Sequence, residues 1–502
     1  MSIVVALILL LMIVGAKGYR VSGSLSGFFL AGRGLGALLL AFSIMATYFS
    51  AASFLGGGGA TYLFNLGFGS WLTAWHVIGV VLMWVLVAER LFKYASRAKI
   101  ISIPDFIEHR YQSKGAKTLS AIVIMFLFTL YLTSVYKGGA IVLAMILNTS
   151  FEVGLALLVA PVLVYIAVGG LRAAALTNLI LGSLMILAAI LTFSYIMIAV
   201  GGPMKGLEAL QNMQIMGRLS GSLWLKFDGM GPPPAMAVGM VPYLIMSTAF
   251  SISMAQLALP SLLMQFHAAK DVKVISRGRI IGPVLVAIYA FLIFSLGAFC
   301  HVVLDPKLSS AEVGSLMRDV DWVIPKTILE LAPPGVRGLI LAAPVAASMS
   351  TLSVTLLVLS AAIVKDVIQS IRPSTSEKKL LMLARATPIA FAVVSAALTL
   401  IQSDIIVEIV SAAFGTIFVC FLGPVTIGLY WRGATKAGSI TSMTSGLIVG
   451  LLWYVLLYKK AANPVVAWVH PIVPALAISL PLFFIVSLFT KKPPKEVVDL
   501  LG

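Results

Sequence analysis

The segment 46-ATYFSAASFLGGGGATY-62 decides how this chain folds, because it places helix-weakening residues inside one of the most apolar regions. Four consecutive glycines, Gly56 to Gly59, follow a cluster of hydroxyl side chains that includes Ser50 and Ser53. Each glycine weakens a helix by about 1 kcal/mol relative to alanine. The run therefore predicts a break in a helix. Alternatively, the small residues form a surface on which another helix packs closely.

The composition around this segment is that of a polytopic membrane protein. Of the 502 residues, 60% are hydrophobic and only 11% are charged, which excludes a soluble globular domain. We interpret residues 1–490 as a single all-α transmembrane domain and residues 491–502 as a short cytoplasmic tail. The sequence contains no recognisable cofactor-binding domain, and we expect no cofactor.

Apolar runs of about 20 residues, each long enough to cross the hydrocarbon core, recur along the whole chain. We expect about thirteen spans, at roughly 2–17, 35–62, 70–92, 118–146, 153–170, 174–200, 236–266, 280–303, 338–364, 386–403, 405–430, 438–458 and 470–489. Positive charge follows the first run instead of preceding it, so we interpret that run as a retained span rather than a signal peptide.

The placement of the basic residues predicts the orientation of the chain in the membrane. Most of the 35 lysines and arginines fall in alternate loops between the expected spans. The positive-inside rule then puts the N-terminus outside and the C-terminus in the cytoplasm of an inner or plasma membrane protein. The net charge of +17 is thus a topology signal, and we expect no nucleic-acid partner. Cys300 and Cys420 both lie in apolar runs and are interpreted as lipid- or protein-facing side chains rather than a disulfide.

A bundle of this kind is a carrier, a channel or a membrane-embedded enzyme. Ionisable residues inside spans are costly and usually functional, and the clearest here are His76, Lys137 and Glu408. The sequence has no HExxH motif and no paired carboxylates, which argues against an enzyme. His76, next to Trp75, is interpreted as a packed histidine with a satisfied hydrogen bond; the alternative is a proton carrier.

The opening segment favours a carrier. Unwound backbone survives in a membrane only where it lines a cavity or is buried in protein. The exposed carbonyls of a broken helix coordinate cations in secondary transporters, and the hydroxyls of Ser50 and Ser53 are suited to contact a solute.

A second unusual stretch is 341-LAAPVAASMSTLSVTLLVLSAAIVKD-366, an apolar helix rich in hydroxyl groups. The Ala347 carbonyl and the hydroxyls of Ser350 and Thr351 share one face. Neutral oxygens of this kind suit a hard cation such as sodium. Alternatively, the hydroxyls bond back to carbonyls of their own helix.

The chain resembles the solute:sodium symporter family over almost its whole length. The resemblance rests on 29-FLAGRGLG-36, the opening segment, 102-SIPDFIEHRY-111, 168-VGGLRAAALTN-178, 343-APVAASMSTLS-353, 423-GPVTIGLYWRGATKAGSITSM-443 and 470-HPIVPAL-476. The pieces LAAPVAASMST, IVKDVIQSIRP, GLYW and HPIVP are most similar to the sodium/pantothenate symporters of that family.

The resemblance implies a five-plus-five inverted repeat of the LeuT type over residues 35–430, with a broken first core helix. It also implies a sodium site built from the carbonyls of Ala46, Phe49 and Ala347 and the hydroxyls of Ser350 and Thr351. Many relatives have an aspartate where this chain has Asn178, and in some of them that acid contributes to a second sodium site. We therefore expect one sodium ion per transport cycle. We also expect the protein to function as a monomer.

The solute is predicted less sharply than the ion. Lys137 is a candidate to attract a carboxylate solute; alternatively, its ammonium snorkels to the outer interface. Further candidate solute contacts are Thr47, Ser53, Thr133, Ser253 and Gln256. These groups suit a hydroxylated carboxylate such as pantothenate, and equally an amino acid or a short monocarboxylate. Gln256 precedes Pro260, so its helix is a candidate for a kink.

Taken together, these features predict a sodium-driven symporter that imports a small organic solute by alternating access. A symporter for another organic anion, an amino acid or a sugar is the first alternative. A membrane sensor on the same fold is the second, although the tail after the last span is too short for a signalling domain. The loops 201–235 and 304–337 are candidates for an outer lid.

Overall fold

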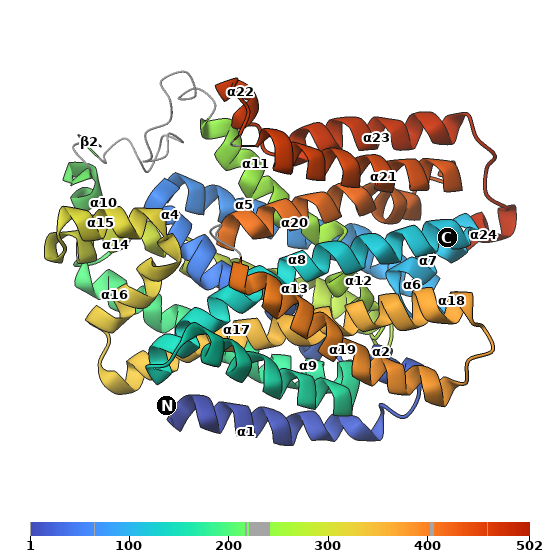
Figure 1. Cartoon of the computed structure of the whole chain (residues 1–502), viewed down its shortest axis with the longest axis horizontal. Helices are drawn as coiled ribbons and strands as arrows, with labels where there is room; N and C mark the ends of the chain where they lie inside the picture. The colour runs from blue at the N-terminus through green and yellow to red at the C-terminus, as the bar shows by residue number, and fades with distance from the viewer. Residues whose placement is uncertain are drawn as a thin grey trace.

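The computed structural model describes residues 2–64, 66–215, 218–219, 241–401, 406–458 and 460–501. These residues are almost entirely helical (Figure 1). The exception is a two-stranded antiparallel ribbon of β1 (Gln214–Ile215) and β2 (Arg218–Leu219). The all-α prediction is therefore confirmed apart from this short ribbon.

The helices of the first half are α1 Ser2–Ala16, α2 Leu25–Leu30, α3 Ala37–Tyr48, α4 Gly58–Phe64, α5 Leu66–Leu82, α6 Glu89–Arg97, α7 Ile103–Tyr111, α8 Lys114–Leu147, α9 Phe151–Ala199 and α10 Pro203–Asn212. Those of the second half are α11 Val241–Met254, α12 Pro260–Phe266, α13 Val272–Phe294, α14 Leu296–Leu304, α15 Ser310–Arg318, α16 Val323–Leu331, α17 Pro334–Ala361, α18 Gln369–Ile371, α19 Glu377–Ile401, α20 Ile406–Phe421, α21 Lys436–Leu452, α22 Pro464–Ala467, α23 Ile472–Leu488 and α24 Lys495–Asp499.

The number of membrane crossings is only partly fixed by these bounds. Within the described residues, nine helices are long and apolar enough to cross a membrane, and a bent pair of helices makes ten. The first and last expected spans correspond to α1 and α23, which are shorter. The count of thirteen is therefore not confirmed, although each expected span corresponds to a helix. The expected span 236–266 begins outside the described residues. Residues 216–217 and 220–235 of the candidate lid loop 201–235 also lie outside them.

Two expected spans, 153–170 and 174–200, form the single element α9 of 49 residues. A straight helix of that length would extend about 74 Å, far more than one crossing needs. The chain turns at Gly170, whose φ of +55° is costly for residues with a side chain. A Cβ at this position would also overlap the Phe28 carbonyl oxygen. The turn at Gly170 therefore separates two helical arms of about 20 and 29 residues.

The bundle has two distinct ends, which we name by what they carry (Figure 1). The loop end carries α10, α14, α15 and α16 together with the N-terminus, and the tail end carries α6, α7, α18 and α24 together with the C-terminus. The termini thus lie at opposite ends, as an odd number of crossings requires.

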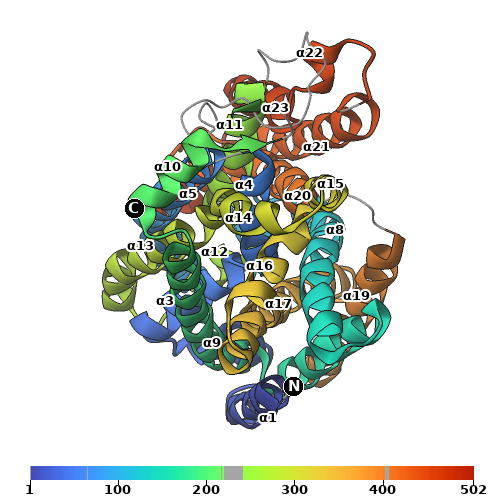
Figure 2. The same cartoon turned by 90° about the vertical axis from the view of Figure 1, so that its left-hand side faces the viewer.

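One of the two most buried spans, which contains α17, lies near the centre of the bundle, between α8, α9 and α3 (Figure 2). In its span, 94% of the apolar window is buried, against 28% for α19 and 22% for α21. The oxygen-rich stretch predicted from the sequence is therefore shielded from lipid on every side, which excludes a role at the lipid surface.

Two helices near this centre are broken. Residues Ala37–Tyr48 and Ala52–Phe64 form two arms bent by 59°, as the sequence predicted. The helix α11 ends in a 3₁₀ turn at Ala255–Leu257, and α12 restarts at Pro260 after an extended Leu259. The helix is thus interrupted after Gln256, where the sequence predicted a kink, while Met246–Phe266 as a whole still forms one apolar span. The two interrupted helices begin the two halves expected for an inverted repeat.

Candidate ion and solute site

The break in the first core helix follows from the bonding of Ser50. Phe49 donates the last regular helical bond, to the Met45 carbonyl, and its ψ of 111° is extended. The Ser50 hydroxyl then accepts a bond from the Ala52 amide at 3.1 Å, and the Ser53 amide bonds to the Ser50 carbonyl at 3.0 Å. Serine at such a position caps a helix start. The second arm therefore begins at the serine, ahead of the glycines.

The glycine run has a different function from the one predicted. Gly56 to Gly59 lie within the second arm, so they do not open the helix, and the alternative of close packing is correct. A Cβ at Gly56 would lie 3.0 Å from the Ile406 side chain of α20, and one at Gly59 would overlap the Val320 carbonyl oxygen. The glycines thus allow α20 and the loop-end segment η9 (Val320–Trp322) to touch the arm.

Four of the five predicted sodium ligands meet where α17 crosses the end of α3. The Ser350 hydroxyl donates to the Ala46 carbonyl at 2.6 Å and to the Ala347 carbonyl at 2.8 Å. The Thr351 hydroxyl donates to the Thr47 carbonyl at 2.9 Å and lies 3.5 Å from that of Ala46. All of these residues are buried. The neutral oxygens, gathered from two helices, match the ligand preference of a hard cation.

The fifth predicted ligand, the Phe49 carbonyl, lies in the break itself. In a continuous helix it would accept from the Ser53 amide, but that amide bonds to Ser50. No hydrogen bond to the Phe49 carbonyl is recorded among the described residues. Its inclusion in the sodium site stays a prediction.

Neighbouring hydroxyls of α17 are engaged elsewhere. Ser348 donates to the Val135 carbonyl of α8 at 3.0 Å, and Ser353 donates to the Ser350 carbonyl within its own helix at 2.8 Å. The back-bonding alternative therefore describes Ser353, and part of the bonding of Ser350. Only the hydroxyls of Ser350 and Thr351 are recorded as reaching the carbonyls of α3.

A second polar layer lies beside this site. The Thr47 hydroxyl accepts from Asn178 Nδ2 at 3.2 Å and from Gln265 Nε2 at 3.1 Å, and Asn178 Nδ2 also lies 3.4 Å from the Ser43 hydroxyl. The amide nitrogens of Asn178 and Gln265 thus fill the space between these oxygens. At Asn178 this chain therefore places a neutral donor beside the hydroxyls of Thr47 and Ser43.

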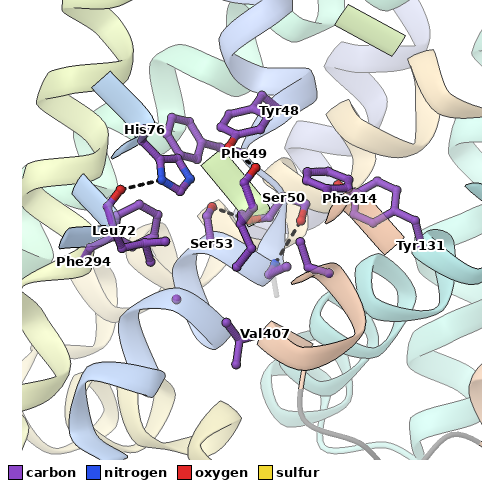
Figure 3. Close-up of a pocket in the computed structure, with 14 residues that line it drawn as sticks. Tyr48, Phe49, Ser50, Ser53, Leu72, His76, Tyr131, Phe294, Val407 and Phe414 are labelled. Carbon is purple, nitrogen blue, oxygen red and sulfur yellow. Dashed lines mark hydrogen bonds between the residues drawn. The ribbon is translucent and has the colours of Figure 1, made fainter. Parts of the chain in front are cut away.

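A pocket opens against the break, on the other side of Phe49. Its atom-free space is about 380 Å³, of which about 30 Å³ admits the centre of a water molecule. Figure 3 shows His76 and Phe49 on one side, Phe414 and Tyr131 on the other, and the serines between them. The complete lining is Tyr48, Phe49, Ser50, Ala52, Ser53, Gly57, Leu72, His76, Tyr131, Ile252, Phe294, Val407, Val410 and Phe414. A solute larger than a few waters therefore requires these side chains to move apart.

His76 is the packed histidine that the sequence predicted. Its Nδ1 lies 2.6 Å from the Leu72 carbonyl and 2.7 Å from the Ser253 hydroxyl, and its ring stacks on Phe49 with centroids 5.6 Å apart. A carbonyl only accepts, so Nδ1 carries the proton in this arrangement and Nε2 is an acceptor. Gln256 Nε2 donates to the His76 carbonyl at 3.0 Å.

Of the six predicted solute contacts, only Ser53 lines this pocket. Ser253 and Gln256 hold His76, Thr47 belongs to the polar layer with Asn178, and Thr133 donates to the Leu130 carbonyl of its own helix at 2.7 Å. Direct solute contact by these residues stays a prediction.

Lys137, the sixth, pairs with an acid that the sequence analysis missed. Its Nζ lies 3.1 Å from Asp321 Oδ2, and the side chains are 14% and 0% exposed. Asp321 belongs to η9, far along the sequence and at the loop end, and Oδ2 also accepts from the Ile406 amide at 3.3 Å. No local sequence signal connects the two residues.

The tail end is closed by another cluster of charges. Asp366, in the segment η10 (Ala362–Ile368) that follows α17, accepts from the Ser102 hydroxyl at 2.7 Å, and Lys117 lies 3.8 Å from it. Lys117 also binds Asp105 at 2.7 Å. Burial disfavours the ionised Asp105 carboxyl, but Lys365 and Lys117 together lower its pKa. This cluster fastens α7 to the segment that continues α17.

The aromatic walls of the pocket were also missed. Tyr131, Phe294 and Phe414 are ordinary apolar-span residues in the sequence, and only the fold brings them together. Cys300 and Cys420, in contrast, are free as predicted, and both are buried in the protein rather than facing lipid.

The comparisons with known proteins agree with this geometry. The family model "Sodium:solute symporter family" matches residues 28–446. The sodium/pantothenate symporter of Escherichia coli (strain K12) is 29% identical over 94% of this chain and 92% of its own. The osmoregulated proline transporter OpuE of Bacillus subtilis (strain 168) is 27% identical over 98% and 95%.

Among solved structures, a substrate-bound, outward-open Na⁺-coupled sialic acid symporter superposes with a TM-score of 0.78 at 16% identity, covering 98% of this chain and 97% of that one. A nucleobase-cation-symport-1 family transporter gives 0.53 at 14% identity, covering 94% and 98%. These relatives and neighbours are transporters rather than enzymes. The chain belongs to the sodium:solute symporter family.

Proposed function

We propose that this protein imports a small organic carboxylate together with one sodium ion, by alternating access. The observation that carries the proposal is the meeting of Ser350 and Thr351 with the carbonyls of Ala46 and Thr47, beside a pocket in the broken helix. Ion and solute would then be held by the same helix break, so that each changes the other's affinity.

The sodium ion is assigned to the carbonyls of Ala46, Phe49 and Ala347 and the hydroxyls of Ser350 and Thr351. A proton cycle is less well supported, because the pocket has no carboxylate and His76 is held by Leu72 and Ser253. One ion per cycle is supported by the polar layer, in which the Asn178 amide donates to the oxygens that a second cation would need.

Pantothenate is the first solute to test and proline the second. A sodium/pantothenate symporter and a proline transporter are both similar to this chain over nearly its whole length. The pocket offers Ser53 as a hydroxyl, His76 Nε2 as an acceptor and aromatic walls for apolar groups. Pantothenate would use its amide and hydroxyl groups there, whereas proline would use its ring. The small pocket favours proline, the smaller of the two molecules, and proline is therefore the alternative solute.

The proposed orientation places the loop end outside and the tail end in the cytoplasm of an inner or plasma membrane, with the protein acting as a monomer. The tail end carries Arg90, Lys93 and Arg97 of α6 and Lys114 and Lys117 at the start of α8, which supports this orientation through the positive-inside rule.

Uptake into proteoliposomes tests the proposal. Labelled pantothenate and labelled proline are offered separately with an inward sodium gradient, and with potassium in place of sodium. We expect sodium-dependent accumulation of one of them above its outside concentration. Uptake that is equal in sodium and potassium would reject sodium coupling. Sodium-dependent uptake of neither, with uptake of a third solute, would reject only the solute.

A further inference from the structure

The Lys137–Asp321 pair joins three elements at the loop end of the pocket. Asp321 is fully buried, and its Oδ2 accepts from both the Lys137 ammonium and the Ile406 amide at the start of α20. Its Oδ1 is buried without a hydrogen-bond partner among the described residues. A buried carboxylate of this kind is costly unless a cation compensates it.

The Lys137–Asp321 pair lies on the loop-end side of the break in the first core helix. Val320, the residue before Asp321, places its carbonyl against Gly59, and Gly138, the residue after Lys137, packs against Ala51 in the break. On α8, Lys137 lies about 9 Å nearer the loop end than the pocket residue Tyr131, at a rise of 1.5 Å per residue. The segment η9 can therefore seat on the second arm only if Asp321 enters the bundle next to Lys137.

We propose that Lys137 is a shared counter-ion: it receives the carboxylate of the arriving solute while the loop end is open, and Asp321 when η9 closes. Closure then requires that the solute has left Lys137 for the pocket, because one ammonium cannot neutralise two carboxylates in a buried site. This role rests on the proposed function for the solute and the orientation, but the closing contact itself does not.

The two partners are not equivalent, and this asymmetry gives the test. Removal of Lys137 leaves a fully buried carboxylate uncompensated, which we expect to shift the equilibrium about 100-fold toward the open state. Removal of both charges relieves that penalty. Lys137→Met should therefore hold the loop end open, and Lys137→Met/Asp321→Asn should close it again.

The opening is measured in cells by the labelling of Ser53→Cys, a pocket residue, with a membrane-impermeant maleimide. The two native cysteines are buried, and the parent without Ser53→Cys gives the background. With Lys137→Met added to Ser53→Cys, we expect labelling at least about tenfold faster than with Ser53→Cys alone. The rate should return to that of Ser53→Cys alone in the double charge variant and in Lys137→Arg. Size-exclusion chromatography and thermal melting confirm that each variant is folded.

Glu330→Gln is the matched control, because Lys307 and Glu330 form a loop-end ion pair at 2.6 Å whose side chains are 53% and 47% exposed. It should change nothing, as exposed pairs contribute little. Met204 of α10 is 78% exposed, so labelling of Met204→Cys in cells reports whether the loop end faces outward. If Met204→Cys is not labelled in cells, the labelling experiments are carried out in inside-out vesicles instead.

The solute half of the proposal is tested in the double variant, whose gate closes but whose ammonium is absent. Compared with the unsubstituted protein, the double variant should have a KM about tenfold or more higher for the carboxylate solute. Its KM for the corresponding carboxamide should be unchanged. Equal labelling of Lys137→Met and its parent, persistent fast labelling of the double variant, or an unchanged KM would overturn the shared counter-ion. Labelling needs no solute, so a protein that transports neither pantothenate nor proline can still show the closing contact.

Discussion

Replacing Thr351 tests the ion site most directly, because one position offers both a loss and a conservative change. Thr351→Val keeps the shape of the side chain and removes the hydroxyl that now donates to the Thr47 carbonyl. Thr351→Ser keeps the oxygen and removes only a methyl group. If the oxygen is an ion ligand, sodium affinity should follow the oxygen and not the volume.

The expected magnitude comes from the bonding. A neutral hydroxyl–carbonyl bond contributes about 1 kcal/mol net, whereas a polar contact to a charged group contributes about 1.5–3 kcal/mol. Loss of one ligand should therefore raise the sodium concentration for half-maximal uptake by about 10- to 150-fold, since 1.4 kcal/mol is a factor of ten. Ser350→Ala should raise this sodium concentration similarly. Replacing both residues should raise it beyond the sodium concentrations that the assay can reach.

The assay is initial uptake of the identified solute in proteoliposomes at graded sodium, with constant ionic strength and equal reconstituted protein. Ser353→Ala is the control, because that hydroxyl bonds within its own helix. We expect Thr351→Ser and Ser353→Ala to stay within a few-fold of the parent. If Thr351→Val has the parent's sodium dependence, or if Thr351→Ser is impaired as strongly as Thr351→Val, the ion-ligand assignment is wrong.

Three further predictions concern the surroundings of the site. Gly59→Ala should abolish uptake, because its methyl would overlap the Val320 carbonyl in the closed state, at a cost of about 1–3 kcal/mol or more, while Gly23→Ala, with nothing within 4 Å, should be silent in the same assay. Asn178→Asp should change the sodium dependence of uptake from hyperbolic to sigmoidal, because a buried carboxylate beside the ion site recruits a second cation; an unchanged curve would contradict this. Burial raises the pKa of Asp321 to about 6, against the lowering effect of Lys137 and with Asp319 adding to the rise. The closed state therefore binds this proton more tightly than an exposed carboxyl does, so the pocket should open less often as the pH falls from 7 to about 5. Maleimide reacts with the thiolate, whose fraction falls with pH in every variant, so the rate for Ser53→Cys is divided by the rate for the exposed Met204→Cys at the same pH. This ratio should fall with pH when Asp321 is present and stay constant with Asp321→Asn.

The sequence was sufficient for the parts of the fold that depend on local chemistry. Apolar length located the helices, and hydroxyls in an apolar helix marked Ser350 and Thr351. It misplaced the cause of the helix break, because four glycines are a stronger propensity signal than one serine. Their closeness to Ile406 and Val320 becomes visible only once distant segments are packed.

The solute contacts were harder for the same reason. Polar residues inside spans are natural candidates for solute contacts, but buried polar groups usually bond to protein, and Ser253 and Gln256 bond to His76. The walls of the pocket are aromatic residues, which every span contains, so no pattern distinguishes Tyr131 or Phe414. Asp321 lies outside the expected spans and was not weighed as a partner for Lys137.

The bonding of the ion site suggests how a modest ion affinity can move a large bundle. The hydroxyls of Ser350 and Thr351 donate to the carbonyls of α3, so hydrogen bonds between the same oxygens join the two helices. A cation between them would replace hydrogen bonds that contribute only about 1 kcal/mol each. The arrangements with and without the ion can therefore differ by little in free energy, which is the condition under which a sodium gradient can shift the population from one to the other. A site of fixed carboxylates would instead be strongly destabilised when empty, so the neutral oxygens of this site are suited to release the ion as well as to bind it.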